Sequence, residues 1–218
     1  MGMEESLMYE NFSIPDIEEL PDLLIRKIHL NGFNVTIPYK KQIIPFLHQL
    51  SPEVAEMGAC NCVRILNKKL IGYNTDIVGF ENSLKPFLQK HHTHALILGT
   101  GGAAAAVEFV LRKLNIAFLN VSRTASENAL QYDALNESIL SSHTLIINTS
   151  PVGQYPTIDE CPNIPYEYIG PQHHLYDLIY NPTETLFLQK GKAKGATVQN
   201  GYEMLVLQAE ESWRIWNL

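Results

Sequence analysis

Residues 95–104 read Ala95-Leu96-Ile97-Leu98-Gly99-Thr100-Gly101-Gly102-Ala103-Ala104, and this stretch decides the fold. A short apolar run is followed by a glycine-rich turn, and an alanine-rich segment then opens a predicted helix. The spacing fits G-x-G-x-x-G/A in strand–turn–helix order, in which glycines let backbone N–H groups approach a pyrophosphate at a helix N-terminus. We interpret the stretch as a dinucleotide-binding turn, with a purely structural turn as the alternative.

The segments that follow this turn alternate between strand-like and helix-like patterns. This alternation predicts an α/β fold with a largely parallel sheet. We expect strands over 95–98, 116–121, 144–148, 175–180 and 196–198. We expect helices over 102–114, 127–141, 183–194 and 201–216, and the five prolines within 151–172 indicate a long loop.

The segments that precede the turn alternate as well. We expect strands over 7–14, 32–37, 60–66 and 69–74, with the last two joined at Asn67-Lys68. We expect helices from 15, over 39–50, from 52 with Ser51 as N-cap, and over 77–89. The polar run Lys90-His91-His92-Thr93-His94 indicates a domain boundary between the two halves.

The end of the strand after the glycine turn indicates which dinucleotide binds. It reads Asn120-Val121-Ser122-Arg123-Thr124 and lacks the acidic residue that an NAD site usually offers to the ribose 2′-hydroxyl. Arg123 can pair with a 2′-phosphate, and Thr124 can add a hydroxyl donor. The pattern favours NADP over NAD, and a surface arginine after a strand is the alternative.

Lys40 and Asp76 form a candidate acid–base pair. Lys40 ends Asn34-Val35-Thr36-Ile37-Pro38-Tyr39-Lys40 at a strand–helix junction, and Asp76 ends Gly72-Tyr73-Asn74-Thr75-Asp76 before a predicted helix. Such a pair can exchange a proton with a hydroxyl while hydride leaves the same carbon. A solvated lysine and an aspartate N-cap are the simpler alternatives. Asn61 lies between the two in the sequence and could bind a polyol or satisfy backbone groups in a turn.

Composition excludes several classes of protein. The net charge is −7 and the 16 basic residues form no tract, so we expect no nucleic-acid partner. We expect no secretory signal, because no basic and apolar run precedes the first predicted element, and no apolar stretch is long enough to span a bilayer. Three cysteines (Cys60, Cys62 and Cys161) are typical of reduced thiols in a cytoplasmic protein. His91, His92 and His94 favour a solvated linker over a metal site.

Seven ordered motifs resemble the shikimate dehydrogenase family from Asn34 to the C-terminus. They are Asn34-Val35-Thr36-Ile37-Pro38-Tyr39-Lys40, Asn74-Thr75-Asp76, Gly99-Thr100-Gly101-Gly102-Ala103, Ser122-Arg123-Thr124, Asn148-Thr149-Ser150-Pro151-Val152-Gly153, Asp177-Leu178-Ile179-Tyr180-Asn181-Pro182 and Asn200-Gly201-Tyr202-Glu203-Met204-Leu205. The resemblance implies reversible NADP-dependent reduction of 3-dehydroshikimate to shikimate in aromatic amino-acid biosynthesis. It also implies a substrate domain over 1–80, a Rossmann-type NADP domain over 81–199, and a C-terminal helix over 200–218 that returns to the substrate domain.

The resemblance also implies a role for each matching residue. Lys40 and Asp76 become the catalytic pair. The substrate's hydroxyls and carboxylate are expected to contact Thr36, Asn61, Tyr180 and Gln208. The cofactor is expected to contact Gly99, Thr100, Gly101, Gly102, Ala103, Ser122, Arg123, Thr124, Thr149, Ser150, Leu178, Gly201 and Met204, the last five lining the nicotinamide side.

The sequence departs from the family pattern at the front and near the cofactor. Family members open with a strand and a Ser-x-Ser segment that binds the substrate carboxylate, and nothing before Asn34 matches it, so we expect an N-terminally truncated substrate domain. Ala104 and Ala105 stand where the family often has serine and a basic residue, Glu127 replaces a second basic residue, and Gln154 replaces a methionine. These changes are expected to weaken cofactor affinity or the preference for NADP.

Two alternatives to the leading interpretation follow from these departures. One is a quinate/shikimate dehydrogenase with relaxed cofactor use. The other is a catalytically impaired nucleotide-binding homologue or truncated product. We expect a monomer or homodimer.

Overall fold

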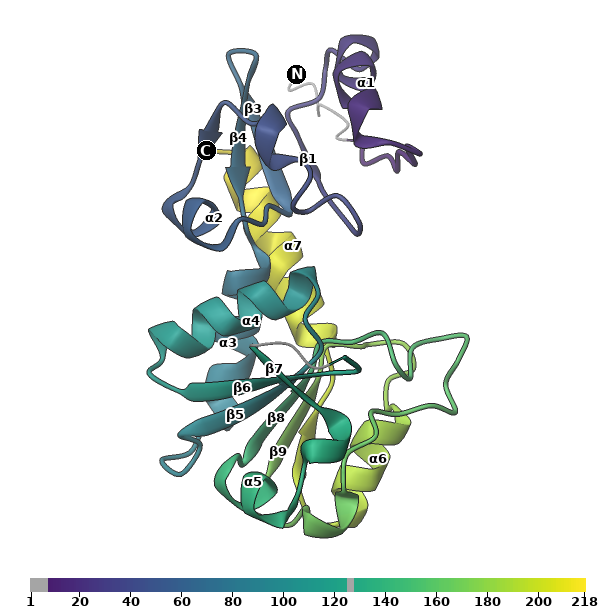
Figure 1. The fold of residues 1–218 in the computed structure, drawn as a ribbon. Helices are drawn as coiled ribbons and strands as arrows, with labels where there is room; N and C mark the ends of the chain where they lie inside the picture. The colour runs from purple at the N-terminus through teal and green to yellow at the C-terminus, as the bar shows by residue number, and fades with distance from the viewer. Residues whose placement is uncertain (1–7, 125–127) are drawn as a thin grey trace, which may run out of the picture.

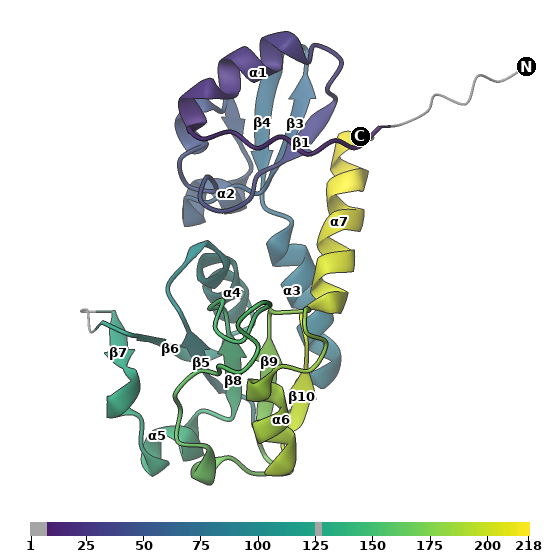
Figure 2. The same cartoon turned by 90° about the vertical axis from the view of Figure 1, so that its right-hand side faces the viewer.

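The computed structural model describes residues 8–124 and 128–218, which form two units joined by helices (Figures 1 and 2). Leu7 and Glu127, used in the sequence analysis, lie outside the described residues. The upper unit in both views is built on one sheet and the lower unit on another, with four and six strands in the described ranges.

The lower sheet is parallel throughout its described pairings and has the strand order β10-β9-β8-β5-β6-β7. Its strands are β5 (His94–Leu98), β6 (Ala117–Ser122), β7 (Ala129–Gln131), β8 (Leu145–Asn148), β9 (His174–Asp177) and β10 (Thr197–Gln199). Its helices are α4 (Gly102–Lys113), α5 (Glu137–Ser142) and α6 (Leu186–Ala193). The prediction of an α/β fold with a parallel sheet is confirmed. The strand order reverses between β5 and β8, where sheets of this kind bind ligands at their carboxyl ends.

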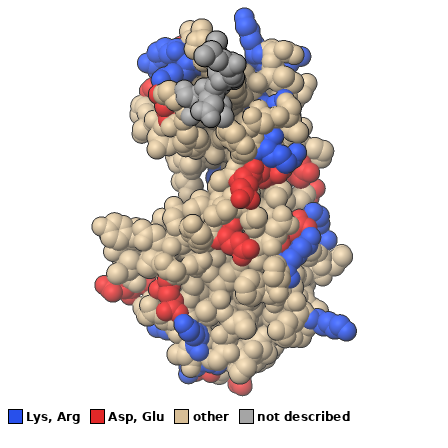
Figure 3. Space-filling model, turned by 180° about the vertical axis from the view of Figure 1, so that it is seen from behind, with Lys and Arg blue, Asp and Glu red and all other residues tan. Residues whose placement is uncertain are grey.

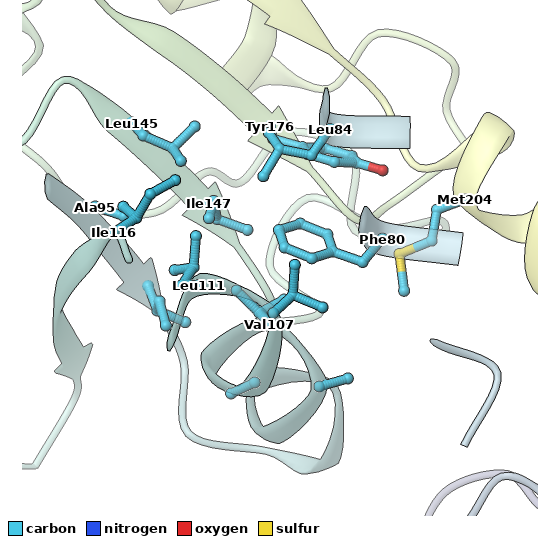
Figure 4. Packing of buried hydrophobic residues seen from close by; sticks show 14 of the residues in the cluster. Phe80, Leu84, Ala95, Val107, Leu111, Ile116, Leu145, Ile147, Tyr176 and Met204 are labelled. Carbon is cyan, nitrogen blue, oxygen red and sulfur yellow. The ribbon is translucent and has the colours of Figure 1, made fainter. Parts of the chain in front are cut away.

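Buried side chains cover both faces of this sheet, as the near-continuous apolar runs of its strands require. On one face, Ile147 packs with Phe80 and Val107 from the covering helices (Figure 4), and Ile97 belongs to the same cluster. The opposite face has its own cluster, in which the alternate residues of β5 and β8 pack with Phe187 of α6. The central strands are therefore fixed from both sides, which holds their carboxyl ends in place.

The upper sheet has the order β1-β3-β4-β2, with β2 parallel to β4 and the other pairs antiparallel. Its strands are β1 (Gly32–Asn34), β2 (Gln49–Leu50), β3 (Cys62–Leu66) and β4 (Lys69–Tyr73), and its helices are α1 (Leu20–Arg26) and α2 (Pro52–Met57). The predicted turn at Asn67-Lys68 is confirmed, since both residues have positive φ. Ser51 caps α2 as expected, because its Oγ accepts from the Val54 N–H at 3.3 Å.

Three predicted elements were wrong. Residues 8–14 form no strand, since they make no ladder with β1, which stays at the edge of its sheet in the described ranges. Residues 39–50 form turns, the 3-10 helix η2 (Ile44–Phe46) and β2 instead of a helix, since Pro45 lacks an N–H and clashes with a preceding helical turn. The predicted helix over 127–141 is shortened to α5, because Ala129–Gln131 pairs with β6 to extend the sheet.

Two helices, α3 (Asp76–Leu84) and α7 (Tyr202–Trp216), join the units. α3 begins at the end of β4 and buries Phe80 and Leu84 in the lower core, and α7 runs beside it up to the upper unit (Figure 2). There the Trp216 Nε1–H donates to the Val63 carbonyl at 3.1 Å, so the C-terminal helix packs back on the upper unit. The expected limits 1–80, 81–199 and 200–218 stay a prediction.

The surface carries mixed charge. On the face shown in Figure 3, described acidic and basic side chains are interspersed, and a notch separates the two units at one side. No helix within 8–124 and 128–218 has both the length and the apolar character needed to cross a membrane.

Gly79 sets the spacing of α3 and α7. A Cβ at this position would lie 2.7 Å from the Met204 carbonyl oxygen and 3.0 Å from the Gln208 Cβ. We therefore expect Gly79→Val to lower the free energy of unfolding by about 1–3 kcal/mol through overpacking. Urea unfolding would measure the change, with the exposed neighbour Asn82→Val as control. Equal stability of the two variants would contradict this account.

Histidines gather at the amino ends of the lower strands. They are His91, His92, His94, His143, His173 and His174. His174 is fully buried, stacks on Phe87 with ring centroids 5.1 Å apart, and contacts the Thr197 hydroxyl through Nδ1 at 2.9 Å. Burial, aided by the nearby His92, lowers the pKa of His174 from 6.5 to about 4.

This lowered pKa gives a stability contribution with a definite sign. It is fully present above pH 6.5 and is lost as pH falls through the folded-state pKa of about 4, because the unfolded chain binds the proton more tightly. Between pH 7 and pH 4, the wild-type free energy of unfolding should fall by about 2–3 kcal/mol relative to that of His174→Phe. Denaturant titrations at several pH values test this, with the exposed His29→Phe as control. Parallel profiles for wild type and His174→Phe would refute it.

Candidate active site

Lys40 and Asp76 form an ion pair at the junction of the two units. The Lys40 Nζ lies 2.7 Å from the Asp76 Oδ2, and the two side chains are 17% and 10% exposed. Lys40 stands in the turn after β1, where its carbonyl accepts from the Cys60 N–H at 2.8 Å, and Asp76 is the first residue of α3. The structure thus brings together two groups that lie 36 residues apart in the sequence.

Asn61 fixes the other side of the carboxylate. Its Nδ2 donates to the Asp76 Oδ1 at 2.9 Å and to the Thr75 Oγ1 at 3.1 Å. Its Oδ1 accepts from the Thr75 N–H at 2.7 Å, which satisfies a donor at the start of α3. This geometry fits the interpretation of Asn61 as a residue that satisfies backbone groups, and it also orients Asp76.

A buried hydroxyl pair links this site to α7. The Thr75 Oγ1 lies 3.1 Å from the Ser212 Oγ and 3.4 Å from the Gln208 Oε1. Ser212 also donates to the Asn34 Oδ1 at 3.1 Å, which ties β1 to the same helix. Sequence reasoning missed the contacts of Thr75 and Ser212. Their only signals were the place of Thr75 beside Asp76 and the four-residue spacing of Gln208 and Ser212.

Two expected substrate contacts lie apart from this network. Thr36 and Tyr180 are exposed, and among the described residues no hydrogen bond joins their side chains to Lys40 or Asp76. The Thr36 carbonyl accepts from the Tyr39 N–H at 2.9 Å, which shapes the turn that presents Lys40. Their roles toward a substrate stay predictions.

The glycine turn has the shape that a dinucleotide requires. Gly99 adopts a φ of +118°, and a Cβ there would lie 2.8 Å from the Thr149 Oγ1. A Cβ at Gly101, the N-cap of α4, would meet no atom within 4 Å, so the helix N-terminus faces open space. Gly102 approaches the acid–base pair, since its Cβ would lie 3.7 Å from the Lys40 Cδ. Backbone donors at this end suit a pyrophosphate.

An open cavity of about 880 Å³ lies next to this turn, at the end of β6. Its lining includes Thr100, Ser122, Arg123 and Thr124, with Arg123 and Thr124 exposed. A guanidinium there can make bidentate bonds to a phosphate. The residues present therefore fit the adenosine and 2′-phosphate half of NADP.

Most of the expected nicotinamide contacts lie just after the carboxyl ends of β8, β9 and β10. The Thr149 Oγ1 donates to the Leu98 carbonyl at 3.1 Å, and the Ser150 Oγ donates to the Asn148 Oδ1 at 2.7 Å. Gly201 approaches Leu178 so closely that a Cβ would collide with the Leu178 carbonyl. Met204 differs from these, because it is 8% exposed and its side chain lies beside Phe80 in the lower core (Figure 4).

One departure from the family pattern acquires a structural explanation. Ala104 is 1% exposed and packs in the lower core, so its side chain points away from the cofactor cavity. The absence of a hydroxyl group at this position therefore affects packing in the lower core more than it affects phosphate binding. Ala105 is partly exposed on the same helix.

Comparison with known proteins identifies relatives over nearly the whole chain. The family model described as "Shikimate dehydrogenase substrate binding domain" matches residues 3–63. A shikimate dehydrogenase (NADP(+)) of Caldicellulosiruptor saccharolyticus is 35% identical over 226 residues, covering 96% of this chain and 81% of the relative. The corresponding protein of Staphylococcus haemolyticus is 36% identical, covering 99% of this chain and 83% of the relative.

Solved structures agree with these relatives. The shikimate dehydrogenase of Aquifex aeolicus superposes with a TM-score of 0.82 at 32% identity, covering 93% of this chain and 78% of that one. The enzyme of Thermus thermophilus, solved in complex with NADP(H) and shikimate, has a TM-score of 0.81 at 32% identity, with 92% and 78% covered.

Proposed function

This chain belongs to the shikimate dehydrogenase family, and we propose that it catalyses the reversible NADP-dependent reduction of 3-dehydroshikimate to shikimate. The observation that carries the proposal is the Lys40–Asp76 ion pair, which stands at the unit junction within reach of the glycine turn. An acid–base group beside a dinucleotide site is the arrangement that carbonyl reduction needs.

Lys40 moves the proton in this reaction. NADPH, when bound, supplies the hydride that reduces the carbonyl carbon. The Lys40 ammonium donates a proton to the carbonyl oxygen as it gains negative charge, which produces the hydroxyl group. In the direction of shikimate oxidation, the neutral amine takes that proton back. Lys40 is mostly buried, which limits competing exchange with water.

Asp76 and Asn61 orient the proton donor. Asp76 holds the ammonium through Oδ2, and the Asn61 amide holds the opposite oxygen, Oδ1, so the carboxylate has one preferred orientation. Gln208 lies beside Thr75 at the same site and offers an amide for substrate hydroxyls. Thr36 and Tyr180 are proposed as further substrate contacts.

Arg123 supports NADP as the cofactor, and the relatives named above act with NADP. Arg123 places its guanidinium in the cavity at the end of β6, at the position where an acidic residue would favour NAD. Two alternatives are tested by measuring rates with each substrate and cofactor. A quinate/shikimate enzyme with relaxed cofactor use would also turn over quinate or use NAD, and an impaired homologue would show no turnover. The cytoplasmic location and the monomeric or homodimeric state stay predictions.

Lys40→Met should abolish most of the turnover. Removing a positioned general acid typically costs about 10²–10⁴-fold, so we expect kcat to fall in this range with little change in the NADP KM. Steady-state oxidation of shikimate, followed by NADPH absorbance, measures the loss. Lys41→Met is the matched control, since Lys41 is the exposed neighbour and should keep its rate within about twofold. Equal rates for the two variants would remove Lys40 from the mechanism.

Arg123→Ala should change cofactor choice. Loss of a charge-assisted bond to the 2′-phosphate, at about 1.5–3 kcal/mol, predicts a rise of about 10–100-fold in the KM for NADP. The KM for NAD should stay the same, because NAD has no 2′-phosphate. Arg26→Ala, on α1 of the upper unit, controls for loss of positive charge. A parallel rise in both KM values would mean that Arg123 does not read the phosphate.

A further inference from the structure

Asp177 is a fully buried carboxylate at the carboxyl end of β9. Its Oδ1 accepts from the Asn148 Nδ2 at 3.0 Å and from the Ile179 N–H at 3.1 Å, and its Oδ2 accepts from the Thr185 Oγ1 at 2.6 Å. These donors come from the end of β8, from the segment after β9 and from the N-cap of α6. One side chain therefore ties the end of β8 to both ends of the segment that joins β9 to α6.

Each of the first two bonds continues to an expected nicotinamide contact. The Asn148 Oδ1 accepts from the Ser150 N–H at 3.1 Å, and the Asn148 carbonyl accepts from the Leu178 N–H at 3.0 Å. The Ile179 carbonyl accepts from the Gly201 N–H at 3.0 Å. The backbone of both walls thus lies one hydrogen bond beyond a direct partner of Asp177.

The carboxylate is costly to keep in this place. Burial raises the pKa of Asp177 from 3.8 to about 6, although three donors oppose the rise. None of the described ion pairs involves Asp177. At neutral pH the fold therefore holds a buried carboxylate whose charge is compensated by hydrogen bonds alone. Burying such a charge without an ion-pair partner is energetically unfavourable.

We propose that Asp177 is a positioning residue that fixes the two walls of the nicotinamide site. Thr149 and Ser150 form one wall, and Leu178 and Gly201 form the other. The inference rests on the proposed function, because it is that function which places the nicotinamide at these walls. Asp177 itself touches neither substrate nor cofactor, since it is completely enclosed. Its effect is transmitted through Asn148 and Ile179.

The first test separates the two halves of the cofactor. Isothermal titration would compare NADP with 2′,5′-ADP, which carries the adenosine and 2′-phosphate but no nicotinamide. For Asp177→Ala we expect the Kd of NADP to rise at least threefold, while the Kd of 2′,5′-ADP stays within 1.5-fold. A general disturbance of the lower unit would weaken both ligands equally, and that result would overturn the proposal, as would unchanged binding of both.

The second test uses turnover and two further variants. Loosely held walls should lower kcat at least tenfold in Asp177→Ala, because small misplacements of reacting groups are costly. Asp177→Asn keeps an oxygen that can accept from Asn148 and Ile179, and should restore kcat to within about threefold of wild type. Failure of this rescue, together with normal folding of Asp177→Asn, would count against positioning through the shared acceptor.

Tyr176→Phe is the matched control. Tyr176 is the preceding residue of β9, is equally buried, and loses a 2.6 Å contact with the Ser83 hydroxyl when the phenol oxygen is removed. It should bind NADP and turn over normally. If Asp177→Ala does not fold, Asn148→Ala removes the link to Ser150 and should give the same selective loss. A wild-type chain that neither binds NADP nor oxidises shikimate would instead contradict the proposed function.

Discussion

The hydrogen bonds from the Asn61 amide to the start of α3 are the constraint on which the site depends. They satisfy the Thr75 N–H and hold the Asp76 carboxylate, so the start of α3 is joined to the segment that enters β3. The same helix buries Phe80 and Leu84 among the side chains that cover the lower sheet. Its first residue thus belongs to the acid–base pair, and its remaining turns belong to the nucleotide-binding unit.

This arrangement brings groups from the two units together at one junction. Lys40 comes from the upper unit and meets the glycine turn, where a Cβ at Gly102 would lie 3.7 Å from its Cδ. Met57 of α2 reaches across in the same direction and packs against the lower core. α7 supports the junction from the other side through Ser212 and Trp216. The relative placement of Lys40 and the glycine turn is therefore set by packing at several points.

Much of this could be predicted from the sequence, and the failures have physical causes. The parallel sheet and the glycine turn follow from local patterns of apolar runs and glycines. Local patterns made Lys40 and Asp76 candidates only, and the family resemblance was needed to pair them. The helix predicted over 39–50 was wrong because its apolar spacing serves the upper core, where Ile43 is 1% exposed, and Pro45 forbids a regular helix. The Thr75–Ser212 contact joins residues 137 positions apart, and no local pattern specifies such a partner.

The strand β9 carries opposite titrations at its two ends. Its first residue, His174, has its pKa lowered to about 4, and its last, Asp177, has its pKa raised to about 6. As pH falls from 6.5 towards 4, the folded chain binds a proton at Asp177 more readily than the unfolded chain does, which stabilises the fold. Over the same range the unfolded chain binds a proton at His174 more readily than the folded chain does, which destabilises the fold. The two shifts are of similar size, so they largely cancel. The combined contribution of β9 to acid stability is therefore small, although two opposing buried groups stand at the two ends of this four-residue strand.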